Sequence, residues 1–524
     1  MKRKSLIKKT FLTLVFAVLF FVLNACDIGS DIGYEVYGED YFRDTGNADD
    51  GINDNESYSL IPENVGKTED FYVLNLEDSG ERYTFDTIKA KVLAEDSRCI
   101  IYAEVDPQTE EPLDGITRDK AEQLSEEYWK NIHALIVRAY GPIKHVTAKD
   151  KPGSGKVTFL LTDIRDSYTG SGGYVAGFFA PFDMEKDNPN GIRSNERDML
   201  YIDTDPGFSD DNIPYATMAH ELQHLINYSN TVAVHGYEPD LWINEGLSTA
   251  AEYLYGGDPN SRVSYYNQDP YGSIRYGNNF FVWDDDDDVL ADYSTGYLFF
   301  QWLRLHADNG EGIYKDIYTS LKKAVTDYRA VTRAAKFRMR IPDMYGSDQW
   351  EPVLKSWYLA NIVGAPGGIY GYNNQISEIT GNNVNGLTVH YLRTTSGAPV
   401  SLAPGEGVFS KMTSSSYTPL FYGVGPNIRY AGADRTQRSV VLAAPYSGEY
   451  FLTLNVNSNY RGGSEYGPLV AASESSEGAG NAETVPQSRS FSVKSSSAQS
   501  DPLPGTYPVD AWVMLKRNKK AFNE

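Results

Sequence analysis

Two histidines four residues apart, with a glutamate directly after the first, restrict the fold of this chain more than any other feature. The pair is His220 and His224, and the glutamate is Glu221. Four residues turn an α-helix by about 40°, so both imidazoles project from one face, one turn apart. Apolar residues occupy a separate arc of the same helix, namely Met218, Leu222, Leu225 and Ile226. The sequence therefore predicts a helix that packs on a core and presents its histidines to a cleft.

This arrangement of side chains suits a zinc ion. Two neutral ring nitrogens one turn apart can bind one tetrahedral Zn²⁺. A glutamate that borders the same face can reach a water on the metal without binding the metal, which makes Glu221 the candidate general base. The alternative is a pair of histidines on a solvated helix. Histidine is scarce here, with 7 in 524 residues, so a chance occurrence of this pattern is rare.

A catalytic zinc takes three protein ligands and keeps one position open. A second helix is predicted from Leu241 to Glu252, beginning roughly 20 residues after His224, a distance that lets two helices pack side by side. Glu245 lies in its first turn, and Glu252 follows seven residues later on the same face. From the residues alone either carboxylate can be the third ligand, with the other orienting a histidine. The alternative is a pair of surface carboxylates.

These two segments resemble those of the gluzincin metallopeptidases, the class of thermolysin and the zinc aminopeptidases. The resemblance is carried by His-Glu-Leu-Gln-His and Trp-Ile-Asn-Glu-Gly. The fuller strings, His-Glu-Leu-Gln-His-Leu-Ile-Asn-Tyr and Asn-Glu-Gly-Leu-Ser-Thr-Ala-Ala-Glu, are most similar to the hyicolysin-like neutral zinc metallopeptidases, which are secreted bacterial enzymes. The similarity extends over residues 70–365 and is most specific from Ala219 to Tyr255. It implies Glu245 as the third zinc ligand and Glu252 as a residue that supports a histidine.

The resemblance also implies a side chain that stabilises an oxyanion beside the zinc. Tyr293-Ser294-Thr295-Gly296 is similar to the Tyr-x-x-Gly segment that supplies this tyrosine in zinc aminopeptidases. Tyr293 is therefore a second catalytic candidate, chosen from 39 tyrosines. His306 is an alternative by similarity to thermolysin, although a structural role is its simpler interpretation. Since no acidic motif for capturing a free amine is evident, we expect an endopeptidase rather than an aminopeptidase, acting on protein or peptide substrates.

The N-terminus has the pattern of a bacterial lipoprotein signal. A basic segment that includes Lys2 and Arg3 precedes an apolar run from Phe11 to Leu23. The run ends in Leu23-Asn24-Ala25-Cys26, which resembles a lipobox and implies acylation of Cys26. The alternative is an ordinary cleaved signal with an incidental cysteine. We therefore expect an extracytoplasmic, membrane-anchored lipoprotein at the outer membrane, the cell surface or the periplasmic face.

The chain is predicted to be an α+β protein with several parts. Residues 1–25 form the signal peptide, 26–67 an acidic flexible tether and 68–110 a β-rich segment. Residues 111–365 form a zincin-like metallopeptidase domain, with a mixed sheet and active-site helices. Short β-prone runs over residues 383–517 predict an all-β, sandwich-like domain. Tyr174 to Phe179 is either an ordinary strand or one that pairs with an extended substrate.

Charge and cysteine content exclude two classes of protein. The formal charge of -24 is the opposite of what a nucleic-acid-binding protein needs. Two cysteines cannot form a disulfide framework, and Cys99, in an apolar run, is predicted to be a buried thiol. The acidic run Asp284–Asp288 leaves a Ca²⁺ site possible, although like charges usually mark a solvated loop. A non-enzymatic surface lipoprotein, which binds a partner through its C-terminal β-module, is the main alternative function.

Overall fold

The computed structural model describes the greater part of the chain. The described residues are 42–43, 52, 55–76, 84–146, 155–166, 168, 174–208, 214–283, 288–321, 325–342, 344, 350–381, 386–392, 399–412, 415–419, 424–468 and 508–509. The predicted signal peptide and Cys26 lie outside them. The chain divides into two compact units, the first comprising residues 1–238, 254–257 and 494–524 and the second residues 239–253 and 258–493.

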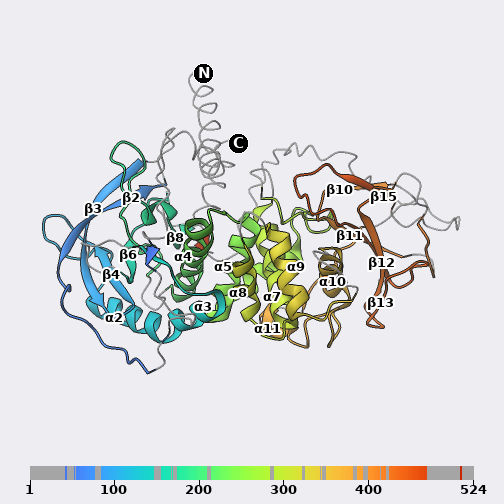
Figure 1. The fold of residues 1–524 in the computed structure, drawn as a ribbon, viewed down its shortest axis with the longest axis horizontal. Helices are drawn as coiled ribbons and strands as arrows, with labels where there is room; N and C mark the ends of the chain where they lie inside the picture. Colours follow the sequence, from blue (N-terminus) through green and yellow to red (C-terminus); the bar gives the residue numbers. More distant parts are fainter. Residues whose placement is uncertain are drawn as a thin grey trace, which may run out of the picture. The chain divides into compact units, whose positions relative to one another are not determined.

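A six-stranded mixed sheet forms the centre of the first unit (Figure 1). Its strands, in spatial order, are β2 (Thr68–Asn75), β3 (Thr84–Glu95), β4 (Cys99–Glu104), β6 (Val157–Thr162), β9 (Met199–Asp203) and β8 (Gly177–Phe179). The three strands β4, β6 and β9 run parallel, and the outer pairings are antiparallel. The parallel strands are buried along almost their whole length, as expected for continuous apolar runs inside a sheet.

Cys99, the first residue of β4, is a buried free thiol as predicted. The run from Tyr174 to Phe179 divides into β7 (Tyr174–Val175) and β8. Strand β8 is the last in the order and pairs only with β9 among the described residues, whereas β7 pairs with β16 (Pro508–Val509). A separate two-stranded ladder joins β1 (Phe42–Arg43) to β5 (His145–Val146).

Helices α2 (Arg118–Glu127), α3 (His133–Tyr140) and α4 (Tyr215–His235) belong to the first unit. Helix α2 packs beside β3 and β4, and α4 packs beside β8 and β9. Helix α2 continues through a π-helical turn over Tyr128–Ile132 into α3. Its start follows from the sequence, because the side chain of Thr117 accepts a hydrogen bond from the Lys120 amide at 3.2 Å.

The buried imidazole of His133 makes the stability of this unit sensitive to acid. Burial is the main cause that lowers the pKa of His133 to about 3, and the charges of Arg98 and His145 lower it further. Between pH 3 and its ordinary value near 6.5, the unfolded chain therefore binds a proton that the folded chain does not. The contribution of neutral His133 to the free energy of unfolding is therefore fully present above pH 6.5 and is lost as the pH falls toward 3.

We expect acidification from pH 7.5 to 4.5 to lower the unfolding free energy of wild type by about 3 kcal/mol more than that of a His133→Gln variant. The reason is that the variant has no imidazole to protonate on unfolding. Urea denaturation of both proteins at the two pH values measures this difference. Parallel losses of stability in the two proteins would show that His133 does not contribute to the acid sensitivity.

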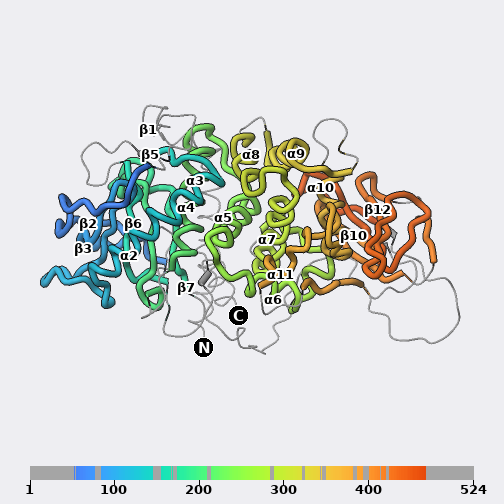
Figure 2. The backbone as a smooth tube through the Cα atoms, turned by 90° about the horizontal axis from the view of Figure 1, so that it is seen from below, coloured from blue at the N-terminus to red at the C-terminus, as the bar shows by residue number. Residues whose placement is uncertain are grey.

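The second unit is mainly helical. Its helices are α5 (Leu241–Tyr255), α6 (Asn260–Gln268), α7 (Val289–His306), α8 (Gly312–Ser320), α9 (Asp327–Arg338), α10 (Trp350–Val363) and α11 (Ile376–Thr380) (Figure 2). An aromatic cluster holds several of them together around Trp242. The Trp242 ring lies 5.0 Å from that of Phe281, 6.1 Å from Phe300 and 6.3 Å from Trp350. Burial of rings of this size dominates the energetics of such a core.

The strands between Pro399 and Pro468 belong to the same unit as these helices. A four-stranded antiparallel sheet has the order β11 (Gly407–Lys411), β14 (Tyr450–Asn455), β12 (Ile428–Asp434) and β13 (Ser439–Val441). A two-stranded ladder pairs β10 (Pro399–Leu402) with β15 (Glu465–Pro468). A buried cluster that includes Leu402, Ile428 and Phe451 joins side chains from both. The sandwich predicted for residues 383–517 stays a prediction.

The two units differ in extent from the parts predicted along the sequence. The first includes the β-rich segment 68–110 together with α2, α3, α4 and β16, and the second includes the helices after Glu238 and the strands from β10 to β15. The predicted boundaries at residues 110 and 365 stay predictions.

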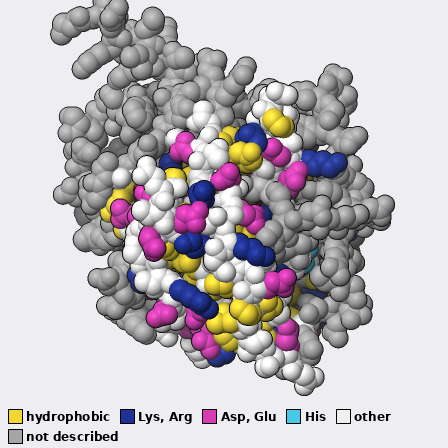
Figure 3. All heavy atoms as spheres, turned by 90° about the vertical axis from the view of Figure 1, so that its left-hand side faces the viewer, with side chains coloured by type: hydrophobic (Ala, Val, Ile, Leu, Met, Phe, Trp, Pro, Cys, Tyr) yellow, Lys and Arg dark blue, Asp and Glu magenta, His cyan; other side chains and the backbone are white. Residues whose placement is uncertain are grey.

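No helix in the described ranges has the length and apolar content that a membrane crossing requires. On the face drawn in Figure 3, basic and acidic side chains alternate, so the charge of -24 forms no single-sign patch there.

Candidate metal centre

Helix α4 carries both histidines, as its sequence pattern predicts. Its apolar arc is fully buried, with Met218, Leu222, Leu225 and Ile226 at 0 % exposure. The helix ends where Gly236 adopts a left-handed conformation with φ 57°, and the Gly236 amide donates to Val232 O. Packing of the apolar arc fixes the rotation of the helix. That rotation determines where His220 and His224 point.

Helix α5 positions the predicted third ligand. Glu245 lies in its first two turns and is 1 % exposed. The next residue, Gly246, packs directly against the ring of Phe300 on α7, so closely that any Cβ at this position would collide with it. The glycine therefore allows α5 and α7 to approach each other beside Glu245.

We expect Gly246→Ala to destabilise the protein by about 1–3 kcal/mol, because the added methyl must displace Phe300 or the helix. Movement of α5 also shifts Glu245, so metal affinity should fall in the same variant. Thermal unfolding and zinc titration measure the two effects. Gly296→Ala on α7 is the matched control, because its Cβ meets only Phe280 at 3.8 Å. An equal effect of both substitutions would contradict the steric explanation.

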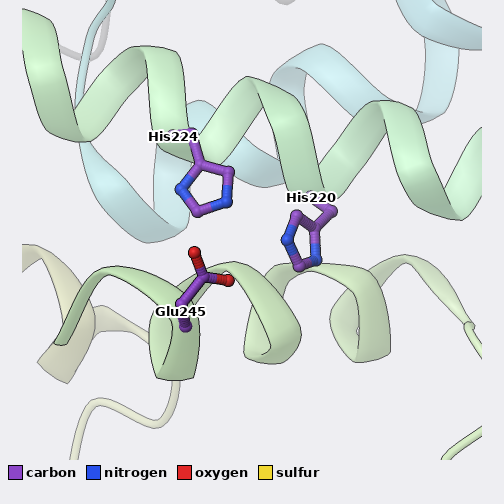
Figure 4. Close-up of side chains that lie close together, drawn as sticks. All are labelled: His220, His224 and Glu245. Atoms are coloured by element: carbon purple, nitrogen blue, oxygen red, sulfur yellow. The ribbon is translucent and has the colours of Figure 1, made fainter. Parts of the chain in front are cut away.

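His220, His224 and Glu245 come together as one cluster of metal-binding type (Figure 4). One ligand atom from each residue lies within 4.8 Å of the others, and all three side chains are buried. The two imidazole rings are 4.9 Å apart at their centroids. Two nitrogens and one carboxylate oxygen are a donor set that catalytic zinc sites use, with a fourth position left open. The side chains therefore fit a zinc ion by their chemistry.

Glu221 follows His220 on α4 and is 2 % exposed. A rotation of about 100° per residue places it beside the histidine face rather than on it. A carboxylate at that position borders the metal cluster without belonging to it. Its role as a general base stays a prediction.

Tyr293 lies next to Glu245. Its hydroxyl donates a buried hydrogen bond to Oε2 of Glu245 at 2.9 Å. Two side chains contact its ring. The centroid of the Trp283 ring lies 4.8 Å from that of Tyr293, and the Arg262 guanidinium lies 4.5 Å from the same centroid. No sequence pattern indicates Arg262 and Trp283, since they reach Tyr293 only through the tertiary fold. The oxyanion role predicted for Tyr293 stays a prediction.

His306 lies far from this cluster. It ends α7, thirteen residues after Tyr293, which is about 20 Å along a helix axis. Its Nε2 bonds to the carbonyl oxygen of Gly371 at 2.8 Å, and burial lowers the pKa of His306. The structural interpretation of this histidine therefore fits its contacts.

Glu252 is half-buried, two turns after Glu245 on α5. Burial raises the pKa of Tyr297, and the negative charge of Glu252 is among the further causes. Support of a histidine by Glu252 stays a prediction.

Most of the predicted calcium run, residues 284–287, lies outside the described residues. Asp288 is described and has a structural use. Its side chain caps α7 by accepting from the Ala291 amide, and it also accepts hydrogen bonds from Tyr265 at 2.5 Å and Ser273 at 2.9 Å. These contacts account for one residue of the acidic run without a cation.

Comparison with known proteins finds similarity to a metalloprotease. The chain is 34 % identical over 211 residues to the neutral metalloprotease ShpI of Staphylococcus hyicus. The matched part covers 38 % of this chain and 46 % of that protein, so the similarity spans about half of the relative's length. A scan against protein-family models found no match.

Proposed function

We propose that this protein is a zinc-dependent endopeptidase. The observation that carries the proposal is the buried cluster of His220, His224 and Glu245, whose donor atoms lie within 4.8 Å of one another. The similarity to a neutral metalloprotease over 211 residues supports it independently. The mixed sheet and the helices beside it are also compatible with a metallopeptidase domain.

In the proposed reaction, side chains of this protein hold the zinc and transfer a proton. His220, His224 and Glu245 would hold the zinc, which when bound supplies Lewis acidity to the scissile carbonyl and to the attacking water. Glu221 accepts the proton of that water and then returns it to the leaving amine. The near-complete burial of these four side chains limits competing solvent and strengthens their electrostatic interactions.

Strand β8 is the proposed place where an extended substrate pairs. The Asp203 amide donates to Ala176 O at 3.0 Å, and Phe178 stands opposite Tyr201 in the register with β9. Since successive residues of a strand direct their N–H and C=O groups to opposite edges, Gly177 and Phe179 direct theirs away from β9. Peptides commonly add to such an edge by main-chain hydrogen bonds. The strand also packs beside α4, the helix of the two histidines.

We expect Phe179→Pro to lower kcat/KM for a peptide substrate by about 3–10-fold, the value of one lost main-chain hydrogen bond. Proline removes the outward N–H, and an edge strand tolerates it because no ladder bond is lost. Phe179→Leu is the control, since it keeps the N–H and changes only the side chain that packs near Tyr228. Peptide cleavage assays measure kcat/KM for both variants. An equal loss of kcat/KM in the two would contradict the pairing of substrate with β8.

Membrane anchoring through acylated Cys26 is a further part of the proposal. It rests on the basic segment, the apolar run and the lipobox-like string that ends at Cys26. Two or more acyl chains give stable anchoring, whereas one chain gives only reversible binding. Expression of wild type and Cys26→Ala in bacteria with labelled palmitate tests this part. Equal labelling, or equal membrane recovery, would favour an ordinary cleaved signal.

Zinc content and casein cleavage, each measured with and without a chelator, test the enzymatic part. We expect one zinc per chain and cleavage that stops on chelation and returns with added zinc. A protein without chelator-sensitive cleavage would support the alternative of a non-enzymatic surface lipoprotein. Cleavage of blocked peptides at internal bonds separates an endopeptidase from an aminopeptidase.

A further inference from the structure

The hydroxyl of Tyr293 donates its hydrogen bond to Glu245 in this structure. The two side chains are 3 % and 1 % exposed, and their hydrogen bond is 2.9 Å long. A bond from a neutral hydroxyl to a buried carboxylate is among the stronger hydrogen bonds in proteins. It restricts the rotation of the Glu245 carboxylate about its final side-chain bond.

The ring of Tyr293 is held from two directions. The guanidinium of Arg262 lies over the ring, 4.5 Å from its centroid, and Trp283 meets it edge to face at 4.8 Å and 71°. Trp283 is itself fixed, because its indole N–H donates to Phe280 O at 2.7 Å. A cation over a phenol ring and an edge-to-face aromatic pair are both attractive contacts. Together they leave the hydroxyl little freedom of position.

The start of α7 is anchored by the same helix that supplies Arg262. The carboxylate of Asp288 caps α7 and accepts a hydrogen bond from Tyr265 on α6. Tyr293 lies in the second turn of α7, so the cap also sets its distance from α6. Arg262 on α6 and Trp283 therefore contact the ring of Tyr293, and the Asp288–Tyr265 hydrogen bond links α6 to the start of α7.

A phenol has one O–H, and this limits what Tyr293 can do at one time. While the hydroxyl donates to Oε2 of Glu245, it has no second proton for an oxyanion. An oxyanion role requires Tyr293 to leave Glu245 during the reaction. The contacts with Arg262 and Trp283 oppose such a movement.

We propose that Tyr293 is a positioning residue for Glu245. Its hydroxyl donates a hydrogen bond to Oε2, so that Oε1 binds the metal. Arg262 and Trp283 hold the tyrosine ring in place. The inference rests on the proposed function, since it takes Glu245 as a zinc ligand. It assigns Tyr293 an action through the ligand rather than on the substrate. Residues that orient metal ligands typically contribute 10–100-fold to metal affinity.

The test is zinc affinity, measured by competition with a chromogenic chelator, in wild type and Tyr293→Phe. We expect the variant to bind zinc about 10–100-fold more weakly, because its ring remains but its hydroxyl is lost. The absorption spectrum of the cobalt-loaded protein should also change, since it reports the geometry of the ligands. At saturating zinc, kcat should stay within roughly tenfold of wild type, below the loss that removal of an oxyanion donor causes.

Tyr297→Phe is the matched control. Tyr297 is equally buried, lies one turn later on α7, and donates its hydroxyl to Ile379 O at 2.9 Å rather than to Glu245. We expect its zinc affinity to equal that of wild type. In a Glu245→Ala background, Tyr293→Phe should cause no further loss of affinity, because the residue through which it acts is gone.

Unchanged zinc affinity in Tyr293→Phe with a 10²–10³-fold loss of kcat would overturn the inference and support the oxyanion role. Additive losses in the double variant would also overturn it. A wild type that binds no zinc would instead refute the proposed function, and this inference with it. The zinc content of wild type therefore separates the two failures.

Discussion

Glu221→Gln is expected to retain zinc and to lose peptide cleavage almost completely. The carboxylate borders the cluster of His220, His224 and Glu245 but is not one of its donors, so its amide should leave metal binding intact. An amide cannot accept the proton of the attacking water. General acid–base catalysis typically contributes 10²–10⁴-fold, and we expect kcat to fall by about that factor.

The measurement combines zinc content, thermal unfolding and kcat on one peptide. Glu311→Gln, an exposed residue at the start of α8, is the control for the loss of one negative charge and should behave as wild type. A Glu221→Gln protein that keeps more than a tenth of the wild-type turnover would refute the role of Glu221. Loss of zinc from this variant would instead indicate that Glu221 belongs to the metal site itself.

The helices of the site could be predicted from the sequence because their patterns are local. His220 and His224 require a shared face at a spacing of four residues, and the apolar arc of α4 supplies the other face. Glu245 follows within a short distance along the chain. For the same reason the buried strands β4, β6 and β9 were recognisable as apolar runs.

The surroundings of Glu245 could not be predicted because they join distant segments. Tyr293 is 48 residues from Glu245 along the chain, and no periodicity indicates that its hydroxyl donates to Oε2. The contact of Arg262 with Tyr293 likewise depends on how α6 packs near α7. Gly246 was recognised as part of a motif, but its physical reason is the ring of Phe300. Local signals thus predicted the three side chains that cluster, His220, His224 and Glu245, while the contacts around Glu245 needed the tertiary structure.

The largest effect on metal binding is expected from His224→Ala. The variant keeps only two of the three clustered donors, His220 and Glu245, and leaves the carboxylate buried. Replacing a residue that orients a ligand lowers metal affinity by up to roughly 100-fold, and we expect the loss of a ligand to lower zinc affinity by well more than that. Peptide cleavage should fall to the level of chelator-treated wild type. Since zinc stabilises only the state that binds it, added zinc should raise the Tm of wild type but not of the variant.

His235→Ala provides the control within the same helix. His235 is exposed in the last turn of α4, so its loss removes an imidazole without touching the cluster. Its zinc content, Tm shift and cleavage should match wild type. If His224→Ala still showed a zinc-dependent rise in Tm equal to that of wild type, the metal would be bound elsewhere. The assignment of His220, His224 and Glu245 as one site would then fail, because a three-donor site cannot lose a histidine and keep its affinity.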